Sequence, residues 1–187
     1  KSDYTKLDQL ATCYEIAELM LPGCTWIYYG DELGMTGNFP KGVDANTGYA
    51  DLWYRQPMKW TADKSVDEDG IFTTSYGVTG SSMIVKWDEI NSTSTVKSAS
   101  EQKGKAGTHY EAIKAFATAK GTTPTLIKGN FVPWDWKINN VKNDYIINFQ
   151  RKLGSEVYTV VVNLSNVNAT AGFKGTVVAS YNGATLS

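Results

Sequence analysis

Hydrophobic residues follow a helical period in the first part of the chain. From Asp3 to Leu21, apolar side chains recur every three or four residues, which predicts an amphipathic helix. Asp3 is the expected N-cap, and Pro22-Gly23 is expected to end the helix. The predicted apolar stripe consists of Leu7, Leu10, Tyr14, Ala17 and Leu21.

A second amphipathic helix is expected after a polar stretch that ends at Thr108. Its apolar positions are Tyr110, Ile113, Phe116 and Ala117, and Gly121 is expected to stop it. His109, the only histidine, lies at its start with no Ser, Cys or ligand cluster around it. We therefore expect His109 to be a solvated helix residue rather than a catalytic one.

Between these helices, residues Thr25–Tyr29 form a short apolar run without alternating polar residues, which predicts a strand buried on both faces. Gly30 lets the backbone turn, and Asp31 and Glu32 follow at the carboxyl end, where parallel α/β folds place ligand groups. Two interpretations are open. The acids face a cleft, or Asp31 caps the turn and Glu32 pairs with a nearby cation.

A lone parallel strand has no ladder partner, so residues Thr25–Tyr29 must pair with strands outside this chain. The chain also opens inside the first expected helix, which suggests that Lys1 marks a cut or a processed end. We therefore expect the polypeptide to be a piece of a larger domain.

The period changes to that of strands after Gly121. Residues Tyr145–Arg151 and Val157–Leu164 flank a turn at Leu153–Glu156, which predicts a β-hairpin. Residues Thr176–Tyr181 predict one more strand. The tail is therefore expected to be a small antiparallel β domain.

Irregular structure is expected from residue 36 to about residue 91, because turn-forming residues are dense at its beginning. A connection this long is unusual unless it builds a binding surface. Its aromatic rings could stack on sugar or base faces, or pack beneath the loop, and composition leaves both open. These aromatic residues are Phe39, Tyr49, Trp53, Tyr54 and Trp60.

One part of this loop resembles a calcium-binding pattern. Asp67, Asp69 and Gly70 match its beginning, but Tyr76 stands where the closing Glu should be. No metal site is expected there. Cys13 and Cys24 are expected to pack as small residues rather than to form a disulfide, and they lack companions for metal ligation.

Composition excludes two kinds of partner. The 187 residues carry 18 basic and 19 acidic side chains without a long run of either sign, so nucleic acid is not an expected partner. No apolar segment approaches the roughly 20 residues that a membrane-spanning helix needs, and no signal-peptide pattern opens the chain.

Several motifs, in order, resemble the C-terminal part of the α-amylase family, glycoside hydrolase family 13. They are Pro22-Gly23, then Ile27-Tyr-Tyr-Gly-Asp-Glu-Leu-Gly-Met35, then Arg55-Gln-Pro-Met-Lys-Trp60. Many relatives read Arg-Thr-Pro-Met-Gln-Trp in the last motif, so Gln56 and Lys59 are departures from it.

The resemblance implies an α/β plus all-β fold, namely the last segment of a (β/α)8 TIM barrel followed by a small antiparallel β-sandwich, domain C. Residues 1–120 would supply the seventh helix, the eighth strand, a long loop and the eighth helix. Residues 121–187 would form domain C. The barrel partner of this chain would be the N-terminal portion of the same enzyme.

The resemblance also implies which chemistry is absent from the chain. Family members cleave α-glucosidic bonds with retention, using acids that follow barrel strands four, five and seven, all of which would precede Lys1. Retaining cleavage needs two carboxyl groups about 5 to 5.5 Å apart. Asp31 and Glu32 cannot serve, because neighbours at a strand end tend to point apart. No catalytic residue is assigned here, and the fragment alone is expected to be inactive.

A sugar-binding pair can be carried over from the family. Relatives hold a glucose unit with an Asp and an Arg four residues later, which is the spacing of Asp51 and Arg55. The carboxylate would accept from sugar hydroxyls and the guanidinium would donate to others. Trp53 or Tyr54 would supply an apolar face. The alternative is a structural salt bridge that fixes the loop.

The implied function is that of a C-terminal fragment of an extracellular or surface-attached α-amylase-like hydrolase of starch or related α-glucans. No cofactor is expected in this chain, and calcium is left to the part that precedes it. One alternative is a non-catalytic carbohydrate-binding module on the β tail, although Tyr145, Tyr158 and Tyr181 are not joined there by a cluster of exposed Trp. Another is an exo-acting α-glucosidase or a neopullulanase.

Overall fold

The computed structural model describes residues 4–35, 58–60, 74–78, 81–85, 96–134, 145–170, 172 and 174–185. The contacts among residues separate the chain into two units. Residues 1–27 and 104–187 form the first unit, and residues 28–103 form the second. The predicted division of the chain at Gly121 into barrel and domain C stays a prediction.

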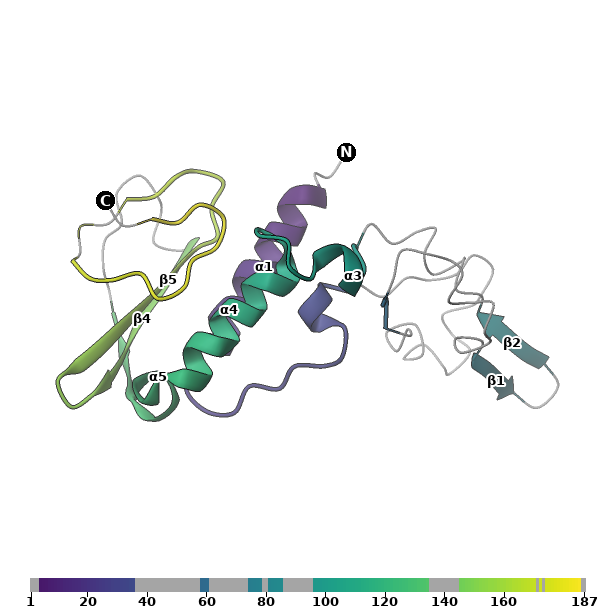
Figure 1. Cartoon of the computed structure of the whole chain (residues 1–187), viewed down its shortest axis with the longest axis horizontal. Helices are drawn as coiled ribbons and strands as arrows, with labels where there is room; N and C mark the ends of the chain where they lie inside the picture. Colours follow the sequence, from purple (N-terminus) through teal and green to yellow (C-terminus); the bar gives the residue numbers. More distant parts are fainter. Residues whose placement is uncertain are drawn as a thin grey trace. The chain divides into compact units, whose positions relative to one another are not determined.

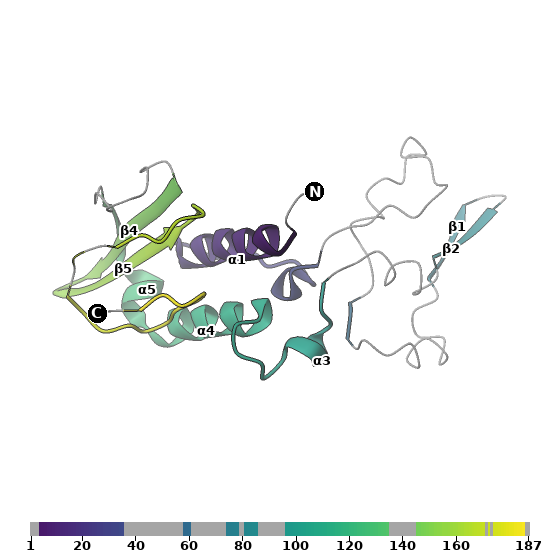
Figure 2. The same ribbon diagram turned by 90° about the horizontal axis from the view of Figure 1, so that it is seen from above.

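Two helices lie side by side in the first unit, as Figures 1 and 2 both show. They are α1 (Tyr4–Met20) and α4 (His109–Thr122), and both helices were predicted from their period. Helix α4 begins at the N-cap Thr108, whose side chain accepts from the backbone N–H of Glu111. It ends at Thr122 rather than at Gly121, one residue later than expected.

The buried face of α1 differs from the predicted stripe. Thr12, Ile16, Leu19 and Met20 are buried, whereas Leu7, Tyr14 and Leu21 are exposed. Of the predicted stripe, Ala17 is fully buried. The helix carries apolar residues on more than one side, and packing against α4 and β5 selects the side that is buried in this unit.

A three-stranded antiparallel sheet follows the helices. Its strands are β3 (Asn130–Pro133), β4 (Ile146–Leu153) and β5 (Glu156–Asn163), in the order β3-β4-β5. The predicted hairpin is confirmed, since Phe149 lies opposite Val160 and Leu153 lies opposite Glu156. Gly154, with φ of 60°, opens its two-residue turn, where a positive φ favours glycine.

The further strand predicted at Thr176–Tyr181 is wrong, because the structure assigns no strand to those residues. Alternation of small β-formers does not make a strand without a ladder partner. Ala179 and Tyr181 instead pack, half-buried, against the hydrophobic core. The described part of the tail is therefore a three-stranded sheet with an irregular extension, and the two sheets of a sandwich are not seen in it.

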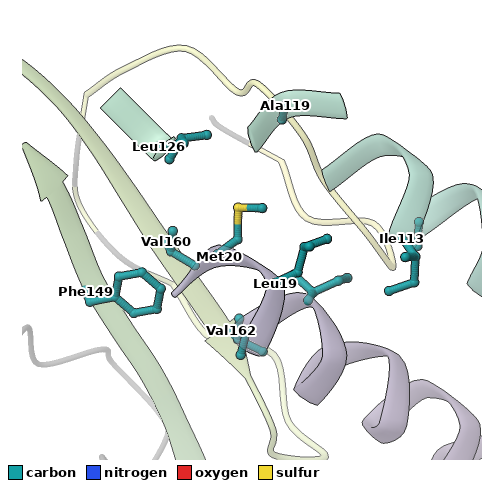
Figure 3. Close-up of a cluster of buried hydrophobic side chains, with 11 residues drawn as sticks. Leu19, Met20, Ile113, Ala119, Leu126, Phe149, Val160 and Val162 are labelled. Carbon is teal, nitrogen blue, oxygen red and sulfur yellow. The ribbon is translucent and has the colours of Figure 1, made fainter. Parts of the chain in front are cut away.

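The core of the first unit lies between the two helices and the hairpin (Figure 3). Leu19 and Met20 of α1 and Ile113 of α4 face Phe149 of β4 and Val160 of β5 in this cluster. Leu126 contributes from α5 (Pro124–Lys128), a short helix that begins with proline at its first turn. This apolar burial joins the helical and β parts of the chain into one body.

Two cationic side chains meet the C-terminal end of α1. Lys120 Nζ donates to the carbonyl oxygens of Leu19 and Leu21, at 2.7 and 3.0 Å. Arg151, with 1% of its surface exposed, donates from Nη1 to the carbonyl of Met20 at 3.3 Å. A helix end leaves its last carbonyls without intrahelical partners and carries negative partial charge, so both contacts are favourable.

The same arginine also binds the segment that follows α5. Arg151 Nη2 donates to the carbonyl of Gly129 at 2.8 Å and to that of Ile127 at 3.4 Å. A Cβ on Gly129 would lie 2.3 Å from the carbonyl oxygen of Thr125 and 3.0 Å from that of Lys152. Glycine is therefore required where α5 approaches β4 this closely.

His109 is not the solvated residue that the sequence predicted. Its side chain is 12% exposed and lies between α4 and α1. Nδ1 lies 2.8 Å from Thr12 Oγ1, and Nε2 lies 2.9 Å from Glu15 Oε2. The position of His109 at the start of α4 does not reveal which side chains the neighbouring helix presents. Here α1 provides a hydroxyl and a carboxylate. The pair links the two helices through polar contacts beside the apolar core.

The second unit contains short elements. They are the 3-10 helix η1 (Asp31–Leu33), the strands β1 (Thr74–Val78) and β2 (Ser81–Val85), and the helix α3 (Ala99–Gln102). Strands β1 and β2 form an antiparallel hairpin. The prediction of irregular structure from residue 36 to about residue 91 is therefore wrong at residues 74–78 and 81–85.

Residues 24–28 belong to no helix or strand, contrary to the prediction of a doubly buried strand at Thr25–Tyr29. Trp26 is 88% exposed, and Ile27, Tyr28 and Tyr29 are also exposed. No ladder partner for this segment lies in the part of the chain that the structure describes. A parallel strand needs a neighbouring strand to pair with, so an apolar sequence by itself does not make this segment a strand.

Replacing Arg151 with Met should lower the free energy of unfolding by about 3 kcal/mol, because buried carbonyls lose their donors. Equilibrium denaturation in urea measures the change. Lys152→Met, on the neighbouring position of β4, is the control and should change stability by less than about 0.5 kcal/mol. Equal effects of the two substitutions would contradict a special role of Arg151.

Candidate functional site

The two acids after residues 24–28 are held by their own turn. Asp31 Oδ2 accepts from the backbone N–H of Tyr28 at 2.9 Å, and Glu32 Oε2 accepts from that of Gly30 at 2.8 Å. Gly30 has φ of 95°, and a Cβ there would lie 3.0 Å from the sulfur of Met35. Asp31 therefore caps a turn that needs glycine, which was one of its two interpretations.

Close by in the second unit, a buried amide connects this turn to a distant part of the chain. Gln102, at the end of α3, is 3% exposed. Its Nε2 donates to the carbonyl of Leu33 at 2.9 Å and to that of Lys97 at 2.7 Å. Leu33 is 1% exposed, so both the donor and this acceptor are shielded from water.

Helix α3 has a complete capping box. The Ser98 backbone N–H donates to Glu101 Oε2 at 2.8 Å, and the Ser98 hydroxyl donates to the same oxygen at 2.7 Å. Such a box satisfies free N–H groups at the helix start and fixes the direction of the entering chain. A helix of one turn is too short to be stable by itself, so these contacts stabilise it.

Residues 58–60 pair with the beginning of α3. The backbone N–H of Ala99 donates to the carbonyl of Lys59 at 2.8 Å, and that of Ser100 donates to the carbonyl of Trp60 at 3.0 Å. Lys59 Nζ donates to the carbonyl of Val96. Burial lowers the pKa of Lys59, and the nearby Glu101 carboxylate partly opposes that shift.

These contacts join the turn at Asp31–Leu33 and residues 58–60 to one short helix, α3. Asp31 and Glu32 each accept from the backbone of their own turn, so the described residues around α3 show no pair of carboxylates arranged for acid–base catalysis.

The predicted sugar-binding residues lie outside the described residues. This applies to Asp51, Trp53, Tyr54 and Arg55, which all fall between Met35 and Met58. It also applies to the partial calcium pattern at residues 67–70 and to the predicted N-cap Asp3. Their roles stay predictions.

No site for metal binding or for thiol chemistry lies among the described residues. No group of three or more His, Cys, Asp or Glu side chains there could hold a metal ion. Cys13 and Cys24 are both free thiols, and burial raises the pKa of Cys13, which keeps that thiol protonated. Among the helices that the structure describes, none has the length and hydropathy to cross a bilayer.

Gln102 and the helix that carries it were missed in the sequence. A signal was present, because Ser98-Ala-Ser-Glu101 has the spacing of a capping box. That spacing predicts a helix start, but it does not identify the buried amide that follows. The carbonyl of Leu33 lies far away in sequence, so only the folded chain could reveal the contact.

No protein-family model matches the chain, and no curated protein matches it. Solved structures do. Amy13B of Eubacterium rectale has 21% identity and a TM-score of 0.55, with 88% of this chain and 26% of that chain covered. The alpha-amylase from H. orenii has 20% identity and a TM-score of 0.53, with 86% and 26% covered.

A third neighbour is a MutB variant in complex with the substrate sucrose, with 20% identity, a TM-score of 0.55, and 82% of this chain and 29% of that chain covered. These neighbours are enzymes of glycoside hydrolase family 13. At such identities the likeness shows a shared fold, and the chain spans less than a third of the length of each neighbour.

Proposed function

We propose that this chain is part of an α-glucan-active glycosidase of family 13, to which it contributes sugar-binding residues and no catalytic acid. The observation that carries the proposal is the exposed apolar run at residues 26–29, in a chain with the fold of part of such enzymes. A solvent-exposed run of Trp26, Ile27, Tyr28 and Tyr29 is unusual for a free surface and typical of one that another segment covers.

The exposed stripe of α1 supports the same proposal. Leu7 and Tyr14 lie seven residues apart, so they share one side of the helix, and each is at least 50% exposed. The partner we propose is the N-terminal portion of the same enzyme. Its strands would pair with residues 25–29, and its sheet would cover this side of α1. We place the complete enzyme outside the cell or on its surface.

The sugar-binding role falls to Asp51 and Arg55, with Trp53 or Tyr54 as the apolar face. A carboxylate and a guanidinium four residues apart can accept from and donate to neighbouring hydroxyls of one sugar ring. The substrate class we propose is starch or related maltooligosaccharides. An exo-acting α-glucosidase or a neopullulanase would use the same pair. No cofactor is proposed for this chain, and any calcium would bind in the preceding part.

A carbohydrate-binding module on the β tail is the less favoured alternative. Of the three tyrosines in that tail, Tyr158 and Tyr181 are half-buried and pack against the core, and Tyr145 is exposed. Stacking on a sugar needs an open aromatic face. Tyr158 and Tyr181 are therefore poor candidates for a flat binding platform.

Residues 25–29 should be protected from hydrogen exchange in the complete enzyme, because a paired strand buries its N–H groups. The same amides should exchange rapidly in the isolated 187-residue chain. Mass spectrometry of peptides covering this segment measures both. The amides of residues 174–178, which are exposed and lie in no helix or strand, serve as an internal reference for rapid exchange. Rapid exchange of residues 25–29 in the complete enzyme would contradict the proposed pairing.

Asp51→Ala and Arg55→Ala, made in the complete enzyme, should weaken oligosaccharide binding by about 1 to 3 kcal/mol, since each removes one charged hydrogen-bonding partner. Catalytic efficiency should fall more on maltoheptaose than on short substrates. Asp44→Ala, in the same segment, is the matched control and should leave kinetics unchanged. Wild-type kinetics with a lowered Tm in both variants would instead support the structural salt bridge.

The isolated chain should not hydrolyse starch, because we place the acid pair for retaining cleavage in the part of the enzyme that precedes it. Release of reducing sugar by the purified polypeptide is the measurement. The complete enzyme is the positive control, and a mock purification from cells without the gene excludes a contaminating amylase. Turnover that follows the concentration of the purified chain would overturn the assignment.

A further inference from the structure

We infer that the contact of His109 with Thr12 and Glu15 is a pH-sensitive switch between α1 and α4. The doubly protonated ring stabilises the packing of the two helices, and loss of one ring proton as the pH rises weakens it. All three residues belong to the first unit, so the switch is independent of the proposed function.

The first ring nitrogen faces a hydroxyl whose proton is already used. Nδ1 of His109 lies 2.8 Å from Oγ1 of Thr12, and the same hydroxyl donates to the carbonyl of Asp8 at 2.8 Å. A threonine hydroxyl has one proton, so Oγ1 accepts from the ring and Nδ1 carries a proton. Thr12 is 1% exposed, so water does not take either place.

The second ring nitrogen faces a carboxylate. Nε2 lies 2.9 Å from Oε2 of Glu15, which accepts, so Nε2 carries a proton as well and the ring is positively charged. The other carboxylate oxygen, Oε1, is buried and has no hydrogen-bond partner among the described residues. A carboxylate with so little hydration is stabilised by a cation beside it, and the imidazolium of His109 is that cation.

Other ionisable side chains of the two helices, among the described residues, are engaged differently. On α4, Glu111 pairs with Lys114 at 3.7 Å, one turn further along. On α1, Asp8 is exposed to water and offers its backbone carbonyl to the hydroxyl, and Cys13 packs as a neutral thiol against the core. Glu15 is therefore the carboxylate that we assign to the charge of the ring.

A hydroxyl, an imidazole and a carboxylate in a row also occur in catalytic triads, but a catalytic role does not fit here. A nucleophilic hydroxyl must reach a substrate. The hydroxyl of Thr12 is buried between the helices and donates to a backbone carbonyl. The row therefore links α1 to α4, which lie side by side in Figures 1 and 2.

Stability should fall as the pH rises, because the contacts favour the charged ring. An unperturbed histidine has a pKa of about 6.5, so the contribution of His109 is fully present below about 6.5. It is lost as the pH rises through the titration of the folded chain, which lies above that value. In the neutral ring one nitrogen has no N–H to donate, and Glu15 stays buried without its cation.

The test uses the fact that His109 is the only histidine of the 187 residues, so a 15N NMR spectrum of the full chain shows one imidazole. Both ring nitrogens should be protonated at about pH 7.5, and the titration midpoint should lie about one pH unit above that of a free histidine. A neutral ring protonated at Nε2 alone, with an ordinary midpoint, would overturn the inference. If the chain alone does not fold, segmental labelling of it within the complete enzyme gives the same measurement.

Glu15→Gln separates the charge from the hydrogen bond, because the amide keeps an oxygen acceptor. It should lower the titration midpoint of His109 by about one pH unit. Glu18→Gln, one turn later on α1, is the matched control, since Glu18 is exposed and the midpoint should stay unchanged. An unchanged midpoint in Glu15→Gln would contradict the switch.

His109→Gln removes the titrating group. The urea midpoint of unfolding should fall less between about pH 6 and about pH 9 in this variant than in the wild type. An equal fall in both proteins would show that His109 is a structural contact without pH dependence. If His109→Gln does not fold, the titration of His109 in Glu15→Gln decides between the two.

Discussion

The C-terminal end of α1 is the point on which the first unit depends. Its carbonyls have no partners within the helix, and Lys120 of α4 and Arg151 of β4 donate to them. Burial lowers the pKa of Lys120, and the nearby Arg151 lowers it further. Two like charges can stay close because helix carbonyls accept from both and carry negative partial charge.

This polar junction places the apolar core. Arg151 also binds the carbonyls of Ile127 and Gly129, so the end of α1, the end of α5 and the hairpin meet at one arginine. Leu19, Met20, Phe149 and Val160 of these elements belong to one cluster of buried hydrophobic residues. A buried guanidinium is costly unless its donors are used, and here Nε, Nη1 and Nη2 each donate to a carbonyl.

In the second unit, a neutral side chain has the role that Arg151 has in the first unit. Gln102 donates to two carbonyls from distant segments without bringing a charge into the interior. An amide suits a short helix with little packing, since burying a neutral donor costs less than burying a cation. In both units, backbone carbonyls that secondary structure leaves free are joined by a side chain from another segment.

The exposed apolar run of residues 24–28 has no such solution within the described residues. Most of its side chains are exposed and no described strand pairs with its backbone, although its sequence has the composition of an interior strand. This exposure is the observation from which we propose that the chain is part of a larger enzyme. The likeness to family 13 structures agrees with it at the level of fold.

Sequence by itself determined α1, α4 and the β4–β5 hairpin, because helical period, capping residues and the glycine turn at Gly154 are local properties. It could not determine which side of α1 is buried, since that depends on the helix and strand that cover it. His109 was misjudged for the same reason, as its partners Thr12 and Glu15 lie on another helix.

The limit of prediction from sequence is clearest for the strands. Residues 25–29 and 176–181 have strand-like sequences but no ladder partner among the described residues, whereas residues 130–133, with weaker sequence signals, pair with β4. The sugar-binding assignment of Asp51 and Arg55 comes from sequence and stays a prediction. The hydrogen bond from Gln102 to the carbonyl of Leu33 was decided by tertiary structure alone, because local sequence patterns do not indicate contacts between residues so far apart in the chain.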